Sequence, residues 1–189
     1  MNAVELFSGA GGILLALRDC EIDVLFSNEI DHKFAQTHYH NFPSVPLIES
    51  DIKNVTAEVL DEATRGENVD LVTGGPPCQG FSIFGKRRFV NTKGYEPKKD
   101  PRNKLVYEFI RIVSTLKPKF FLMENVKGFM NLDSGFFVES IKNEFKNLGY
   151  NDIWCDIVCA ADYGVPQLRQ RMFMIGNRIG IDFIPLLSG

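Results

Sequence analysis

One cysteine beside two prolines is the residue of this chain best suited to nucleophilic chemistry. Cys78 stands in the run Gly74-Gly75-Pro76-Pro77-Cys78-Gln79, directly after the short strand-like segment 70–73. The two prolines stiffen the chain that leads to Cys78. A thiol on a rigid turn after a parallel strand lies where open α/β sheets keep their active sites. A lone cysteine is also commonly a small buried hydrophobe, so the local sequence leaves nucleophile and core thiol both open.

A carboxylate and two arginines could assist such a nucleophile. Glu124 follows the apolar run 120–123, and burial at a strand end would raise its pKa and let it hold a proton for acid catalysis. Arg169 and Arg171 are two residues apart, so they share one face of an extended chain. Their guanidinium groups could hold a base or a carboxylate, although such a pair is also common at a solvated strand end.

A glycine-rich turn near the N-terminus indicates a nucleoside site. The turn 8–12 contains three glycines, but Leu14 stands where the dinucleotide fingerprint has its last glycine. Glu29 lies twenty residues after Gly9 and could accept hydrogen bonds from ribose hydroxyls, while Asp51 could meet an adenine amino group. This pattern suits a nucleoside without a pyrophosphate, such as S-adenosyl-L-methionine. The alternative is that the glycines only form a turn and the acids are surface residues.

The elements that must position these side chains alternate between strand and helix. We expect strands at 3–7, 23–27, 45–48, 70–73, 119–123, 153–159 and 172–175, and helices at 13–19, 31–40, 55–63, 103–116 and 136–148. Repeated β-α units predict an α/β fold, a mostly parallel twisted sheet with helices on both faces. Because parallel strands end at one edge of a sheet, Cys78 and Glu124 are expected to converge there.

The composition narrows the class of protein. With 189 residues and 44% hydrophobic content, the chain fits one domain, 1–189, with a sizeable core. No apolar run is long enough to span a membrane and no secretion signal is recognisable, so we expect a cytoplasmic protein without a membrane partner. The four cysteines have no disulfide-framework spacing, and no metal site is expected.

The charge is unevenly distributed along the chain. The net charge is −3, but residues 86–104 carry +6 from eight basic and two acidic residues, and the remainder carries −9. A basic loop after Cys78 suits a phosphate backbone, and long loops of this kind often close over active sites, although a charge run can also be plain solvated surface. The basic residues are Lys86, Arg87, Arg88, Lys93, Lys98, Lys99, Arg102 and Lys104.

Taken together, the motifs resemble those of the catalytic domain of cytosine-C5 DNA methyltransferases. The similar segments are 5–12, 28–31, 51–52, 76–79, 100–105, 124–126 and 167–171. They follow the family order and span nearly the whole chain. One departure is Glu5, which stands where the family usually has aspartate. The resemblance implies a Rossmann-like fold that depends on S-adenosyl-L-methionine.

The resemblance also implies roles for individual residues. Cys78 would attack C6 of a flipped cytosine, Glu124 would contact N3, and Arg171 would contact O2 with Arg169 nearby. The cofactor contacts would be Phe7, Ser8, Gly9, Gly11, Gly12, Glu29, Ile30, Asp51, Ile52, Pro77 and Leu105. Double-stranded DNA would be the partner, contacted by Gln79, Ser82, Lys86, Arg87 and Arg88.

The sequence departs from the family at its C-terminal end. Family members continue with a target-recognition domain and further supporting segments, whereas this chain ends at Gly189. It could be a truncated chain, one half of a two-chain enzyme or an inactive relic. We expect it to carry the chemistry but to need the missing region, in the same or a second chain, for sequence specificity and efficient turnover.

Two other functions remain open from the sequence. One is cytosine-C5 methylation of transfer RNA, for which the same catalytic residues would serve. Gly80-Phe81-Ser82 favours DNA over transfer RNA. The other is a non-catalytic subunit with a methyltransferase-like fold. Retention of Cys78, Glu124 and both arginines argues against that, because a scaffold has no chemical need for them.

Overall fold

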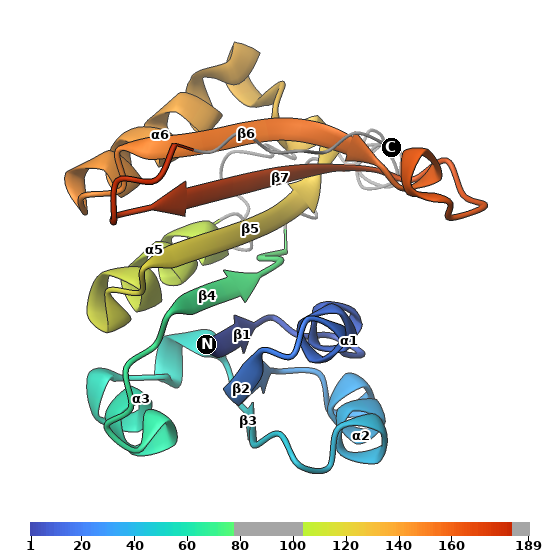
Figure 1. Ribbon diagram of the computed structural model, residues 1–189, viewed down its shortest axis with the longest axis vertical. Helices are drawn as coiled ribbons and strands as arrows, with labels where there is room; N and C mark the ends of the chain where they lie inside the picture. The colour runs from blue at the N-terminus through green and yellow to red at the C-terminus, as the bar shows by residue number, and fades with distance from the viewer. Residues whose placement is uncertain (78–103, 183–189) are drawn as a thin grey trace, which may run out of the picture. The chain divides into compact units, whose positions relative to one another are not determined.

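The computed structural model describes residues 1–77 and 104–182 as a mixed, mostly parallel α/β sheet with strand order β3-β2-β1-β4-β5-β7-β6 (Figure 1). The strands are β1 (Asn2–Leu6), β2 (Asp23–Glu29), β3 (Leu47–Glu49), β4 (Leu71–Gly74), β5 (Phe120–Val126), β6 (Asp152–Cys159) and β7 (Gln170–Asn177). The α-helices are α1 (Gly12–Asp19), α2 (His32–Asn41), α3 (Ala57–Thr64), α5 (Leu105–Leu116) and α6 (Phe136–Asn147). Short 3-10 turns are η1 (Ile52–Asn54), η4 (Lys127–Phe129), η5 (Leu132–Gly135) and η6 (Ala160–Tyr163).

The chain divides into two compact units. The first unit comprises residues 1–75 and 107–122, and the second comprises 76–106 and 123–189. In the part of the chain that the structure describes, no helix is long and apolar enough to cross a membrane.

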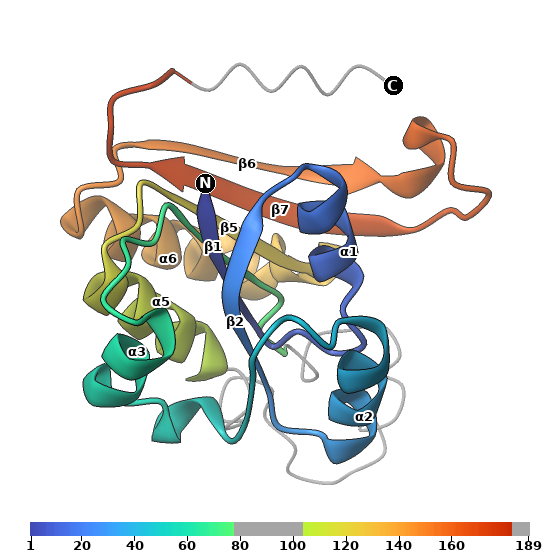
Figure 2. The ribbon, with the colours of Figure 1, turned by 60° about the horizontal axis from the view of Figure 1, so that its bottom comes forward.

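The first unit is a parallel sheet covered by helices on both faces. β1 pairs in parallel with β2 and β4, and β2 pairs in parallel with β3. α1 and α2 lie on one face of these strands and α3 and α5 on the other (Figure 2). Ala3, Leu17 and Leu71 form an apolar cluster beneath α1, against which Ile13, Ile22, Val24, Phe120 and Leu122 pack. This burial fixes the register of β1, whose carboxyl end leads into the glycine turn.

The second unit is built on an antiparallel hairpin. β6 and β7 pair along their whole length, from Asp152 with Asn177 to Cys159 with Gln170. α6 covers one face of this hairpin with its apolar stripe. The buried residues of this unit are Met123, Phe129, Val138, Ile141, Phe145, Tyr150, Met172 and Met174.

Every strand and helix expected from the sequence is present, but three strands are longer than expected at the end that carries a predicted site residue. β2 continues through Glu29, and β5 continues to Val126 instead of ending at Met123. Glu124 is therefore a strand residue, not a residue after the strand. The reason is that burial keeps alternating along β5, with Met123 and Asn125 inside. β7 likewise begins at Gln170, so Arg171 lies within the strand and Arg169 just before it.

Candidate active site

The chain leaves β1 through a turn that uses unusual backbone conformations. Phe7, Gly9 and Gly11 have φ angles of 56°, 54° and 90°. This left-handed region is easy for glycine and costs a residue such as Phe7 of the order of 1 kcal/mol. A Cβ atom at Gly11 would also overlap the Phe42 ring. Glycine therefore allows the sharp turn from β1 into α1, and the N-terminal end of a helix is a common place for a nucleoside or an anion to bind.

Glu29 ties the end of β2 to this turn. One carboxylate oxygen, Oε2, accepts the Gly9 N–H at 2.7 Å, and the other, Oε1, accepts the N–H groups of Ile30 and Asp31 at 2.8 Å each. The structure thus brings Glu29 and the turn together, and the role of Glu29 as an acceptor of ribose hydroxyls stays a prediction. Ile30 beside them is 63% exposed, an unusual exposure for an isoleucine.

Asp51 precedes the short turn η1 and caps it. Its Oδ1 accepts the Lys53 N–H at 3.0 Å, and its side chain remains 36% exposed. Ile52 is buried, at 2% exposure, and anchors the turn in the core of the first unit. The Asp51 carboxylate is thus held by the Lys53 N–H and lies 3.7 Å from Lys53 Nζ, yet it stays accessible to solvent.

Three buried polar atoms near the glycine turn have no hydrogen-bond partner among the described residues. They are Glu5 Oε2, Ser8 Oγ and Thr73 Oγ1. Glu5 on β1 lies opposite Thr73 on β4 in the parallel register, so their side chains share a face. Burial, and secondarily the Glu29 carboxylate, raises the pKa of Glu5 to about 8, against a hydrogen bond from the Leu14 N–H. The sequence marked Glu5 only as a departure from aspartate. A charged residue inside an apolar strand is the signal that could have found it.

The second unit holds a carboxylate and arginine pair. Glu124 Oε1 lies 2.8 Å from Arg171 Nε, and each side chain is 25% exposed. Burial raises the pKa of Glu124, and this outweighs the opposing charges of Arg171 and Arg169 and the hydrogen bond from Arg171. The raised pKa agrees with the sequence-based expectation of an acid that holds a proton. Arg169 lies near enough to lower that pKa, although it is itself exposed.

Asn125, next to Glu124, holds the segment that leads to the predicted nucleophile. Its Nδ2 donates to the Pro76 carbonyl oxygen at 3.0 Å, and its Oδ1 accepts the Val126 N–H at 2.9 Å. Asn125 is 3% exposed, so both bonds are shielded from water. The sequence analysis gave this asparagine no role. The signal was present, because a polar side chain inside a buried strand must find a partner.

Other predicted site residues belong to the second unit or lie outside the described residues. Pro77 is half-buried, and Leu105 is the first residue of α5; both belong to the second unit. The nucleophile Cys78 and the predicted DNA contacts Gln79, Ser82, Lys86, Arg87 and Arg88 lie outside the described residues.

We expect Asn125→Ala to lower the free energy of unfolding by about 1–3 kcal/mol, because it leaves the buried Pro76 carbonyl without a donor. Urea denaturation followed by circular dichroism measures this loss. Asn143→Ala, on the exposed side of α6, is the control and should change stability by less than about 0.5 kcal/mol. An equal effect of the two substitutions would contradict a structural role for the Pro76 bond.

Comparison with known proteins places the chain. Residues 1–183 match the model of the family described as C-5 cytosine-specific DNA methylase. The chain is 40% identical to the Type II methyltransferase M1.HphI of Haemophilus parahaemolyticus, covering 95% of this chain and 46% of that protein. It is also 40% identical to the Type II methyltransferase M.AquIA of a Picosynechococcus species, covering 95% of this chain and 73% of that one.

A solved structure agrees with these relatives. A prophage-encoded DNA modification methyltransferase of Escherichia coli superposes with a TM-score of 0.76 at 37% identity, over 94% of this chain and 46% of that one. The chain thus spans about half the length of several of the proteins that it matches. Its motifs, fold and sequence similarity agree, and the chain belongs to the C-5 cytosine-specific DNA methylase family.

Proposed function

We propose that this chain carries out methyl transfer to C5 of cytosine in double-stranded DNA. The observation that carries the proposal is the Glu124–Arg171 pair, in which a partly buried carboxyl with a raised pKa is held by a guanidinium group. Its neighbour Asn125 bonds to the Pro76 carbonyl, two residues before Cys78. The relatives named Type II methyltransferases support the same reaction.

The first unit fits S-adenosyl-L-methionine as the cofactor. Among the described residues, Ser8 Oγ is buried without a hydrogen-bond partner, beside the turn that Glu29 holds in place. Asp51 offers an accessible carboxylate, and Ile30 offers an exposed apolar surface of the kind on which a purine ring can pack. Backbone N–H groups, a carboxylate for hydroxyls and an apolar surface are what a nucleoside needs. When bound, this cofactor supplies an electrophilic methyl group.

Each of the four predicted catalytic residues has its own role in the proposed reaction. The cytosine ring is a weak nucleophile at C5. The Cys78 thiolate forms a bond to C6 while Glu124 donates a proton or hydrogen bond to N3, which places electron density on C5. Methyl transfer to C5 would break the methyl–sulfonium bond of the cofactor and release S-adenosyl-L-homocysteine. Loss of the C5 proton to water would then break the bond from sulfur to C6, return the Cys78 thiolate and give the N3 proton back to Glu124. Arg171 orients the Glu124 carboxyl and donates a hydrogen bond to the cytosine O2. Arg169 adds positive charge nearby.

Recognition of the DNA requires more than the described residues. We infer that Gln79, Ser82 and the basic residues Lys86, Arg87 and Arg88 contact the flipped nucleotide and its phosphates. We infer that readout of base edges uses residues other than those named here, because contacts to phosphates carry no sequence information.

Covalent trapping tests the proposal. Duplex DNA with 5-fluorocytosine is incubated with the chain and S-adenosyl-L-methionine, alone and with the C-terminal half of a relative added. Fluorine at C5 cannot leave as a proton does, so the adduct accumulates and migrates slowly on a denaturing gel. We expect an adduct that depends on the cofactor and is absent in Cys78→Ser.

The controls of this experiment separate the substrates. Cys155→Ser changes a half-buried cysteine on β6 and should leave the adduct intact. Transfer RNA carrying 5-fluorocytosine should be trapped far more slowly than duplex DNA. No adduct on DNA in either arrangement, or an adduct that persists in Cys78→Ser, would overturn the proposed function.

A further inference from the structure

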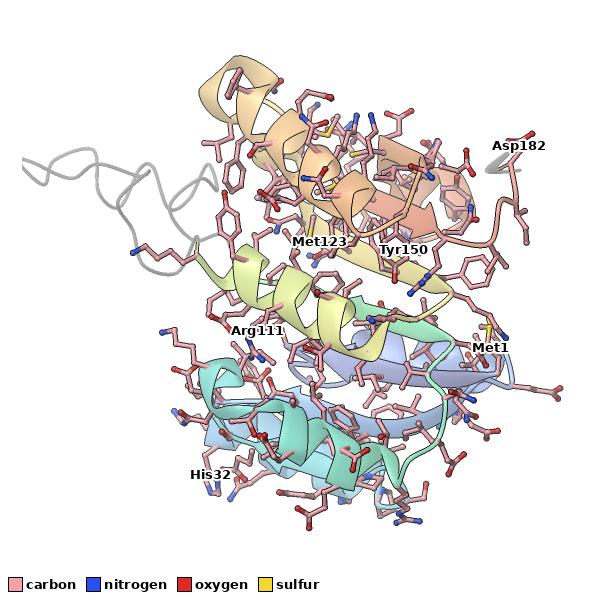
Figure 3. The ribbon with its side chains drawn as sticks, turned by 90° about the vertical axis from the view of Figure 1, so that its left-hand side faces the viewer. Met1, His32, Arg111, Met123, Tyr150 and Asp182 are labelled. Atoms are coloured by element: carbon pink, nitrogen blue, oxygen red, sulfur yellow. The ribbon has the colours of Figure 1, made fainter. Side chains whose placement is uncertain are left out.

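Arg111 lies outside every segment that resembles a family motif. Its side chain nevertheless donates two hydrogen bonds to the backbone of the turn that follows Asp51. We name the segment Asp51–Val55 the adenine turn, because it contains η1 and the proposed adenine contact Asp51. Arg111 projects from α5 toward this turn (Figure 3). Its Nη1 donates to the Val55 carbonyl and its Nη2 to the Ile52 carbonyl, both at 2.9 Å.

The guanidinium group is itself held in place. Its Nε donates to Glu108 Oε2 at 2.7 Å, one turn earlier on α5. All three nitrogens of Arg111 are therefore engaged, two of them with backbone carbonyls 56 and 59 residues away in the sequence. A planar fork with fixed spacing can grip two carbonyls at once, which a lysine ammonium cannot do in the same geometry.

The adenine turn has little of its own to define its shape. η1 is three residues long, and its internal bonds run from Asn54 N–H to the Asp51 carbonyl and from Val55 N–H to the Ile52 carbonyl. Short 3-10 turns have poor hydrogen-bond geometry and need tertiary support. That support comes from the buried side chains of Ile52 and Val55 and from Arg111. The Ile52 carbonyl that Arg111 holds belongs to the same peptide as the Lys53 N–H, which donates to Asp51 Oδ1. Rotation of that peptide would therefore remove a bond that holds the Asp51 carboxylate.

We propose that Arg111 is a positioning residue that sets the selectivity of the cofactor site for adenine, by holding the adenine turn so that the Asp51 carboxylate faces the purine amino group. This inference rests on the proposed function, since it assumes that the first unit binds an adenosyl cofactor. Arg111 touches neither the ligand nor the reacting atoms in this account. It acts through the carbonyls of Ile52 and Val55.

Ligand selectivity provides a test that ordinary destabilisation does not mimic. Dissociation constants of the full chain are measured by calorimetry, without DNA, for S-adenosyl-L-homocysteine and for S-inosyl-L-homocysteine, in which a carbonyl replaces the amino group. The wild-type chain should prefer the adenosyl ligand by about tenfold or more, because an unmatched polar group is costly to bind. In Arg111→Met this preference should fall to about threefold or less, and Arg111→Lys should lie between the two.

Two further variants complete the design. Lys119→Met removes a cation of the same unit that pairs with Asp70 at 2.7 Å, and it should keep the wild-type preference. Asp51→Asn should lose the preference as Arg111→Met does. Thermal unfolding of each variant sets a temperature at which all are folded, and Arg111→Lys remains informative if Arg111→Met does not fold.

The outcomes separate this inference from the proposed function. If the wild-type chain binds neither ligand, the cofactor site itself is refuted and the role of Arg111 falls with it. If the wild-type chain and Arg111→Met show the same preference while Asp51→Asn loses it, the cofactor site stands and Arg111 has only a structural role. A parallel loss in Arg111→Met and Asp51→Asn, with Lys119→Met unchanged, supports the positioning role.

Discussion

Replacing Glu124 with glutamine is expected to slow covalent trapping and methyl transfer by about 100-fold or more. The substitution keeps the size of the side chain and a hydrogen-bond donor, but it removes the proton that the carboxyl can transfer to N3. Burial raises the pKa of Glu124 even though Arg171 lies 2.8 Å from its carboxylate. A larger share of the carboxyl therefore carries a proton near neutral pH than in an ordinary glutamate.

The control for Glu124→Gln is a glutamate with the opposite surroundings. Glu139 on α6 is 62% exposed and pairs with Lys142 at 2.9 Å, so Glu139→Gln should leave the rate within about twofold of wild type. Rates are compared from the time course of the 5-fluorocytosine adduct at saturating cofactor. Equal rates in wild type and Glu124→Gln would mean that the carboxyl proton plays no part in the attack by Cys78.

The dependence on pH gives a second readout for the same residue. A general acid works only while protonated, so the wild-type rate should fall as pH rises through the raised pKa of Glu124. Arg171→Gln removes the opposing charge and should move that fall to still higher pH. The glutamine variant at 124 should show no such fall from this group.

The sequence predicted the elements because their signals are local. An apolar run such as 120–123 indicates a strand, and turn formers such as the glycines at 9, 11 and 12 indicate a turn, each from only a few residues. The strand ends were harder to place. β5 continues through Glu124 because the buried Asn125 side chain is satisfied by a hydrogen bond to the Pro76 carbonyl. The residues around Asn125 in the sequence do not indicate that partner.

In the candidate site, too, local sequence signals were predictable and contacts between distant residues were not. The sequence singled out residues that resemble family motifs. Among them, Glu29 bonds to the glycine turn and Arg171 pairs with Glu124, while their roles toward a ligand stay predictions. Arg111 was not found, because its two backbone partners lie more than 50 residues away and a lone arginine on an amphipathic helix carries no signal. The state of Glu5 was also beyond the sequence, since its pKa depends on how completely the fold excludes water from it.

Glu5 leads to the largest expected effect on stability. Burial raises its pKa from 4.5 to about 8 in the folded chain. The folded state therefore holds the proton more tightly than the unfolded state. The protonated Glu5 carboxyl therefore contributes fully to the free energy of unfolding below pH 4.5, and this contribution is lost as pH rises toward 8. The shift corresponds to at most about 5 kcal/mol, and relaxation of the chain around the charge will reduce it.

Glu5→Gln should remove this dependence on pH, because the amide stays neutral at every pH. Urea denaturation at intervals from pH 5 to pH 9 measures it, with Glu139→Gln as the exposed control. We expect the glutamine variant at position 5 to match wild type near pH 5 and to exceed it by several kcal/mol near pH 9, whereas Glu139→Gln follows wild type throughout. Parallel curves for wild type and Glu5→Gln would mean that water reaches Glu5 in the folded chain. The charged form would then be tolerated beside the glycine turn, and Glu29 would share that turn with a second carboxylate.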